Sequence, residues 1–226
     1  MTLKKILFLL IMGAFFASCE IYNFAEPNGA IYGSLMDNIT NETLQSEQPE
    51  GFNIKLYEEG GRMNSPIIFS GKPDGTFENA WIFQNEYKVI PTEGAFFPVD
   101  TAVVKVGDRT EVNFTVTPFL AVTNVSVEAG SGKITSSYKI VRSQIGDKIV
   151  ERKTLVSKVP TSNNVVFDFK SQTDLSETDD ADILATQYTD EVTDLTSGKY
   201  YVRIAVRTDN GLNKYNYSKV FPVTIP

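Results

Sequence analysis

Hydrophobic and polar residues alternate along most of this chain, in short runs that are separated by turns. In the run 52–57, the apolar residues Phe52, Ile54 and Leu56 share one side. The turn sequences Lys72-Pro73-Asp74-Gly75 and Gly107-Asp108 lie between such runs. The period of two recurs in 30–35, 66–70, 76–83, 87–90, 102–106 and 111–116. Short strands at regular spacing with turns between them predict a β-sandwich or barrel.

The alternation continues beyond Thr117-Pro118, where the proline is expected to end a strand and to separate two domains. The second half has further predicted strands at 120–127, 134–143, 148–156, 165–169, 199–206 and 218–225. Segment 174–190 does not alternate, and a helical turn is expected near 181–187. The pattern therefore predicts an all-β protein of two tandem β-sandwich domains, residues 29–117 and 118–226.

The first 28 residues have a different character. Two lysines are followed by the apolar run 6–16 and then by Ala17-Ser18-Cys19. A basic start, a short apolar stretch and small residues before a cleavage point define a secretory signal. The run is shorter than the roughly 20 residues needed to span a bilayer. We therefore expect residues 1–18 to be a signal peptide and residues 19–28 to be a tether.

Cys19 is the only cysteine in the chain, so no disulfide framework is expected. The stretch Phe16-Ala17-Ser18-Cys19 resembles the bacterial lipobox, although the usual leucine three residues before the cysteine is Phe16 here. That resemblance implies that Cys19 is lipidated and becomes the first residue of the mature protein. Two or more acyl chains, at about 0.8 kcal/mol per buried methylene, give a stable membrane anchor.

Composition excludes several kinds of function. The chain has 28 acidic and 21 basic residues and no basic stripe, which argues against a nucleic-acid partner. It has no histidine, so Ser-His-Asp triads and histidine metal sites are impossible. We find no glycine-rich phosphate loop. No catalytic residue, cofactor or metal is therefore expected, and the remaining enzyme hypothesis is a hydrolase that uses carboxylates alone.

The acidic run from Asp174 to Asp182 offers oxygen ligands of the kind that Ca²⁺ prefers. It lacks the regular spacing of a calcium-binding loop. A solvated acidic loop is the favoured interpretation.

Aromatic residues are the candidate ligand-binding groups, because their rigid apolar faces suit the faces of sugar rings. Phe96 and Phe97 follow Gly94 in a predicted loop, and Tyr215 and Tyr217 share one face after the turn at Asn210-Gly211. These four are the candidates for an exposed platform, although burial is the favoured interpretation for the two phenylalanines. The competing interpretations are that the phenylalanines cap a sandwich end and that the tyrosines reflect strand propensity.

Trp81, the only tryptophan, lies between Phe77 and Phe83 in an alternating run. That position favours core packing over exposure.

Two segments resemble known domain families. The sequences 29–33, 73–77 and 85–89 resemble the carboxypeptidase-regulatory-like, transthyretin-like sandwiches of secreted bacterial proteins, over about residues 27–117. Residues 195–206 resemble the E–F corner and F strand of fibronectin type III-like sandwiches. The second resemblance implies that Tyr200 is a corner tyrosine whose hydroxyl bonds to upstream backbone.

The lipobox, both domains and the joint Thr117-Pro118-Phe119-Leu120 together resemble the DUF3823-like surface lipoproteins of Bacteroidetes, which accompany SusC/SusD-like transport proteins in glycan utilisation. The resemblance implies an outer-membrane lipoprotein exposed at the cell surface. Its expected partners are the membrane, SusC/SusD-like proteins and polysaccharide. Its expected role is non-catalytic glycan binding or accessory work, and a structural or assembly module of the envelope is the alternative.

Overall fold

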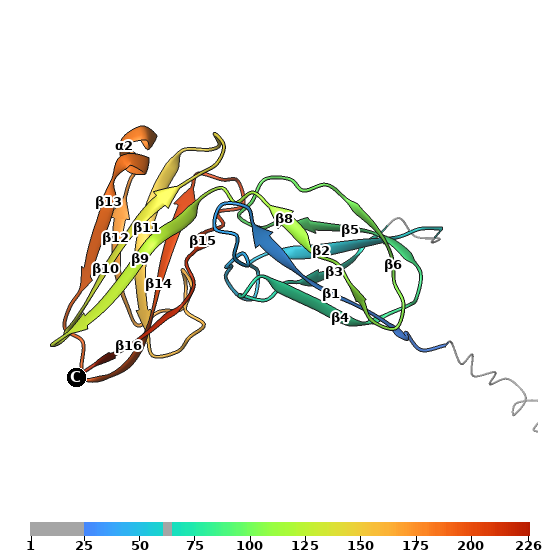
Figure 1. Ribbon diagram of the computed structural model, residues 1–226, viewed down its shortest axis with the longest axis horizontal. Coiled ribbons are helices and arrows are strands. Elements are labelled where there is room, and N and C mark those ends of the chain that lie inside the picture. Colours follow the sequence, from blue (N-terminus) through green and yellow to red (C-terminus); the bar gives the residue numbers. More distant parts are fainter. Residues whose placement is uncertain (1–24, 61–64) are drawn as a thin grey trace, which may run out of the picture.

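The computed structural model describes residues 25–60 and 65–226, and its strands build two sandwiches that lie side by side (Figure 1). The predicted signal peptide, Cys19 and most of the predicted tether lie outside the described residues. Strands β1 to β8 form two sheets, ordered β4-β1-β7 with β8 also on β1, and β3-β2-β5-β6. Strands β9 to β16 form two more, ordered β13-β10-β9 and β12-β11-β14-β15 with β16 also on β14.

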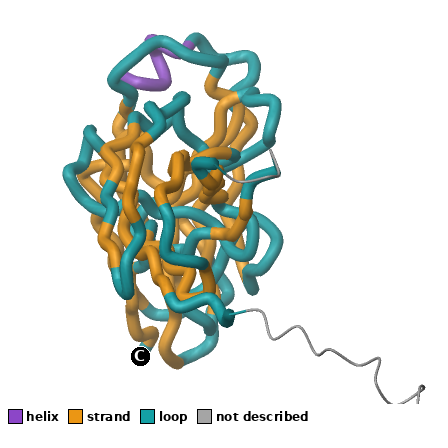
Figure 2. The backbone as a smooth tube through the Cα atoms, turned by 90° about the vertical axis from the view of Figure 1, so that its right-hand side faces the viewer, coloured by secondary structure: helices purple, strands orange, loops and turns teal. Residues whose placement is uncertain are grey.

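Strands dominate the described residues, and the helix α2 lies at one end of the second sandwich (Figure 2). The prediction of an all-β fold is confirmed. Within the described ranges, no helix is both long enough and apolar enough to cross a membrane. The elements are β1 Gly29–Asp37, β2 Asn53–Glu58, β3 Ile67–Ser70, β4 Thr76–Ile82, β5 Glu86–Thr92, β6 Ala102–Lys105, β7 Thr110–Glu111, β8 Phe114–Val116, β9 Ala121–Gly130, β10 Lys133–Val141, β11 Ile149–Ser157, β12 Phe169–Asp174, α2 Asp180–Ala185, β13 Gln187–Val192, β14 Gly198–Thr208, β15 Asn216–Tyr217 and β16 Phe221–Ile225.

Alternation places the core of the first sandwich as the sequence predicts. Ile31 and Leu35 of β1 meet Ile54 and Leu56 of β2, and all four are buried. The turn before β4 closes through a hydrogen bond from the Gly75 amide to the Lys72 carbonyl, and Gly75 has a positive φ of 80°. Glycine adopts this conformation without steric cost, which accounts for its place in the turn.

Gly33 of β1 provides a test of packing in this sandwich. A Cβ at this position would lie 1.6 Å from the carbonyl oxygen of Val112. We therefore expect Gly33→Ala to lower the free energy of unfolding by about 1–3 kcal/mol, as overpacking does. Gly211→Ala is the control, because a Cβ there meets open space. Urea unfolding of both variants checks this, and equal midpoints would contradict it.

The prediction that Trp81 packs in the core is wrong. The side chain of Trp81 is 66% exposed, whereas Phe77 and Ile82 of the same strand are buried. Gly29 pairs with Ile82 but Ile31 pairs with Asn79, so Ala80 and Trp81 together oppose one residue of β1. Such a β-bulge inserts one extra residue, and the insertion turns the later side chains to the other face.

The second sandwich buries one face of β14 between its sheets. Tyr200, Val202, Ile204 and Val206 are buried, as the alternation predicts. The hydroxyl of Tyr200 shares a hydrogen bond of 3.1 Å with the Thr196 hydroxyl. The corner resemblance implied an upstream backbone partner for this hydroxyl. The partner in the structure is instead the side chain of Thr196.

Two assignments in the second half are corrected. Segment 165–169 is mainly loop, with Val165 and Val166 exposed, and β12 starts only at Phe169. β13 was not predicted, because Gln187–Val192 carries polar residues on its outer side and a buried Asp190 on its inner side. The helical turn expected near 181–187 is α2, which Asp179 caps through the Ala181 amide.

Candidate binding site at the seam between the sandwiches

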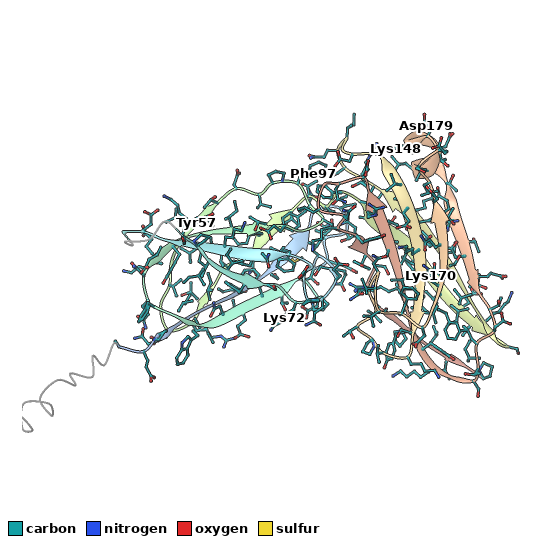
Figure 3. The ribbon with its side chains drawn as sticks, turned by 180° about the vertical axis from the view of Figure 1, so that it is seen from behind. Tyr57, Lys72, Phe97, Lys148, Lys170 and Asp179 are labelled. Carbon is teal, nitrogen blue, oxygen red and sulfur yellow. The ribbon has the colours of Figure 1, made fainter. Side chains whose placement is uncertain are left out.

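The four predicted aromatic residues belong to two segments, 95–97 and 215–217, that meet at the seam between the two sandwiches. Phe96 forms an isolated bridge with Pro118, and Phe97 lies at the seam (Figure 3). Tyr215 and Tyr217 flank Asn216, whose side-chain amide donates a hydrogen bond of 2.8 Å to the Ala95 carbonyl. The sequence therefore identified residues that the fold gathers in one place.

These residues do not form an exposed platform, and the buried alternative holds for Phe96, Tyr215 and Tyr217. Phe96, Tyr215 and Tyr217 are each at most 7% exposed, and the half-buried Phe97 packs edge-to-face on Phe119 at 5.0 Å. Exposure fails for different reasons: Phe96 belongs to the core of the first sandwich, Tyr215 is covered by Lys153 and Glu151 of the second, and Tyr217 is covered across the seam by Glu47. Of these side chains, Tyr217 contributes directly to the joint, through its hydrogen bond to Glu47.

Arg203 is the centre of this joint, and sequence reasoning missed it. Its guanidinium lies over the ring of Tyr217, 4.3 Å from the centroid, and the residue is only 2% exposed. It donates hydrogen bonds of 3.1 Å to the Ser218 and Ser162 carbonyls and one of 2.8 Å to the Ser46 carbonyl in the first sandwich. Burial lowers the pKa of Arg203 to about 10, so the side chain still carries its charge at neutral pH.

The loop 43–51 of the first sandwich is fixed against the second by further hydrogen bonds. The Tyr217 hydroxyl donates to Glu47 at 2.9 Å and accepts from the Asn164 amide at 3.1 Å. Asn163 donates to the Gln48 carbonyl at 2.9 Å. Burial, and then the charge of Glu47, raise the pKa of Tyr217, so its proton stays in place at physiological pH. The two sandwiches therefore meet in a polar, pre-ordered joint.

A groove of about 440 Å³ runs beside this joint, and we call it the seam groove. One wall comes from the first sandwich, through Ile39, Thr40 and Glu42. The other comes from the second, through Asn124, Lys219 and Phe221. The Lys219 ammonium lies 3.4 Å from the Glu42 carboxylate, so an ion pair joins the walls. The lining thus combines an aromatic ring, aliphatic carbon, amide and hydroxyl groups, and charges that cancel.

Asn124 lies in this groove with an unusual backbone. Its φ is 52°, at a register shift where Asn124 and Val125 together oppose Tyr138. Asparagine tolerates this left-handed conformation better than most residues do. The bulge presents an exposed side-chain amide to the groove.

A charged cluster covers the outer face of the larger sheet of the second sandwich. Glu151 accepts a hydrogen bond from Tyr215 and lies 3.1 Å from the Lys153 ammonium. Burial alone would raise the pKa of Glu151, but hydrogen bonds from Tyr215 and Lys153 and the charge of Arg207 outweigh it and hold the pKa below its usual range. In the described part of the chain, the carboxyl groups with a clearly shifted pKa are all shifted downward. A general acid needs the opposite shift.

The acidic run is occupied by structural contacts. Asp179 caps α2, and Asp180 pairs with Arg142 at 3.0 Å. Among residues 25–60 and 65–226, no group of three or more metal-ligating side chains is placed to hold an ion.

One family model and several solved structures are similar to this chain. Residues 29–117 match the family model described as "Protein of unknown function (DUF3823) N-terminal domain". A DUF3823 family protein of Bacteroides uniformis is 24% identical, with a TM-score of 0.75 over 88% of this chain and 100% of its own. A DUF3823 family protein of Parabacteroides merdae is 22% identical, with a TM-score of 0.75 over 88% and 100%.

A third solved structure, also from Bacteroides uniformis, carries the name "putative carbohydrate binding protein". It is 24% identical, with a TM-score of 0.73 over 88% of this chain and 99% of its own. No curated protein matches the chain. At these identities the solved structures show a shared fold. Residues 29–117 are therefore similar to the N-terminal domain of the DUF3823 family.

Proposed function

We propose that this protein is a membrane-anchored, non-catalytic lipoprotein that binds glycans in the seam groove, as an accessory component of an outer-membrane polysaccharide uptake system. Cys19 is its anchor, and the cell surface is its location. The observation that carries the proposal is the groove itself, which two domains build and a buried joint fixes. Ligand sites occur preferentially at domain interfaces and combine an apolar lining with a few polar groups. The name of the similar Bacteroides uniformis protein supports the same ligand class.

The groove suits a short stretch of neutral sugar units. Phe221 offers a ring, Asn124 and Thr40 offer amide and hydroxyl groups, and the paired charges of Glu42 and Lys219 favour neither an anion nor a cation. Carboxyl groups held below their usual pKa, together with the absence of histidine, support a binding role over a hydrolytic one.

Variants of the groove test this function. We expect the wild type to bind at least one of soluble starch, xylan, arabinogalactan and pectin in isothermal calorimetry. Phe221→Ala should weaken that binding about tenfold, since an aromatic contact contributes roughly 1 kcal/mol. Asn124→Gly should also weaken it while keeping the backbone, because its positive φ suits glycine.

The control is Tyr57→Ala, which removes an exposed aromatic ring of the first sandwich outside the groove (Figure 3). Thermal melts of each variant separate a loss of binding from a loss of fold. If Tyr57→Ala weakens binding as much as Phe221→Ala does, the groove is not the site.

The joint favours a second candidate, a structural or assembly module that acts beside SusC/SusD-like transport proteins. A buried arginine that fixes one domain on another, as Arg203 does, suits a protein that holds a set shape. This candidate predicts no polysaccharide binding in calorimetry and co-purification with a transport complex after mild solubilisation.

A further inference from the structure

Two aromatic side chains at the far end of the first sandwich are exposed and take no part in the seam groove. Trp81 is 66% exposed and Phe83 is 48% exposed. They lie on either side of the buried Ile82 in sequence, so both point away from the core. Large apolar groups exposed together mark interaction sites more often than isolated ones do. We call Trp81 and Phe83 the aromatic edge.

The aromatic edge lies where the chain enters the first sandwich. Ile82 pairs with Gly29, the first residue of β1, and the chain leaves the sandwich there toward its N-terminus (Figure 1). β1 then runs the length of the sandwich and ends at Asp37, whose carboxylate accepts hydrogen bonds from the amides of Ile39 and Thr40 in the wall of the seam groove. The aromatic edge and the groove therefore lie at opposite ends of the same strand.

The predicted tether is short. Residues 19–28 join the lipidated cysteine to β1, and a segment of this length reaches roughly 35 Å when fully extended and roughly 17 Å on average as a flexible coil. An anchor at Cys19 therefore keeps the Gly29 end of the first sandwich near the bilayer. Trp81 and Phe83 are exposed at that end.

We propose that the aromatic edge docks on the surface of the bilayer that carries the acyl chains, so that the first sandwich stands on the membrane with the seam groove turned outward. The proposal rests on the lipid anchor of the proposed function. Tryptophan is enriched at membrane interfaces, where its amphipathic ring sits among the headgroups. The β-bulge turns Trp81 outward and so makes its ring available for this contact.

Charge around the aromatic edge indicates how it docks. Near this end of the sandwich, Lys88 is paired with Glu59, and the Asn85 amide donates to Glu58. Arg109 is paired with Glu78, so the described residues at this end include no cluster of unpaired basic side chains, and such a surface gains little from anionic lipids. Docking is therefore apolar, and we expect it to persist over roughly a tenfold range of salt, which would weaken an electrostatic contact.

The chain's single tryptophan makes the test direct. The lipidated full-length mature protein is placed in phosphatidylcholine vesicles with and without brominated acyl chains, and tryptophan emission is measured. We expect brominated lipid to quench Trp81 emission by about half. We also expect acrylamide in the aqueous phase to quench Trp81 less in the vesicle-bound protein than in the same protein without lipid anchor and vesicles. Phe83→Ala should reduce the quenching by brominated lipid.

The control moves the tryptophan to the second sandwich, as Trp81→Phe combined with Tyr201→Trp. Tyr201 is partly exposed on β14 in the second sandwich. The emission of the tryptophan introduced at this position should not respond to brominated lipid. Flotation of the vesicles tests the anchor separately. Protein that floats without quenching of Trp81 overturns the docking edge alone, and protein that does not float overturns the anchor and the docking together. Emission that shifts with soluble polysaccharide and ignores brominated lipid would assign the aromatic edge to sugar binding and overturn the proposal.

Discussion

Replacing Arg203 by methionine should lower the free energy of unfolding by about 3–5 kcal/mol. Methionine keeps most of the volume but leaves the carbonyl oxygens of Ser46, Ser162 and Ser218 without their donor. A buried polar group that loses its partner costs roughly 1–3 kcal/mol, and three are affected here. Urea unfolding followed by circular dichroism measures the loss.

Arg109→Met is the matched control for this prediction. Both guanidinium groups stack on a tyrosine at almost the same distance, 4.3 Å for Arg203 on Tyr217 and 4.4 Å for Arg109 on Tyr32. The side chain of Arg109 is 63% exposed, however, and its nearest carboxylate is 3.5 Å away, so its removal should cost less than about 1 kcal/mol. Similar losses for both variants would mean that stacking, and not the buried hydrogen bonds, stabilises the joint.

The same variant tests whether the two sandwiches unfold together. Trp81 emission reports on the first sandwich, and near-ultraviolet circular dichroism reports mainly on the second, where most of the tyrosines of the described residues lie. With Arg203 in place we expect the two signals to change at the same urea concentration. Without it, the hydrogen bond that crosses to Ser46 is lost, and the two transitions should separate.

The alternation of apolar and polar residues predicted which side chains fill each sandwich. It did not predict the positions where the alternation itself is interrupted. Ile54 and Val202 are buried because a period of two is a direct consequence of the pleat. Trp81 was misplaced because a single bulge reverses that parity, and nothing local in the run 76–83 marks the extra residue. Register depends on the partner strand, which sequence reasoning on one strand does not see.

The seam shows the same limit at the level of the site. Tyr215 and Tyr217 were recognised as a pair on one face, but loop 43–51 covers Tyr217, and Lys153 and Glu151 cover Tyr215, all distant in sequence. Arg203 occupies the outward position between Val202 and Ile204, where alternation predicts an exposed charge. Its burial depends on loop 43–51 of the first sandwich, which folds over it and supplies the Ser46 carbonyl. Contacts between domains leave no period in either sequence segment, so the groove beside them was not predictable.

Asp190 should be as sensitive to replacement as Arg203 is. It is 5% exposed and accepts hydrogen bonds of 2.8 Å from the Tyr138 hydroxyl and the Thr154 hydroxyl, and another from Arg152. Burial alone would lower the pKa of Arg152, but the hydrogen bond and charge of Asp190 and the contact with Tyr138 raise it above its usual value. The carboxylate therefore neutralises a half-buried cation inside the fold.

Asp190→Asn should cost about 3–5 kcal/mol in urea unfolding, because it leaves the Arg152 charge without its buried counter-ion. The adjacent residue provides the control. Glu191 pairs with Lys133 at 2.7 Å, but both side chains are about half exposed, so Glu191→Gln should cost at most about 1 kcal/mol. Both changes remove one negative charge from the same strand, so net charge cannot account for a difference between them. If Asp190→Asn costs no more than Glu191→Gln does, Arg152 finds compensation in solvent and the buried network is not what stabilises this sandwich.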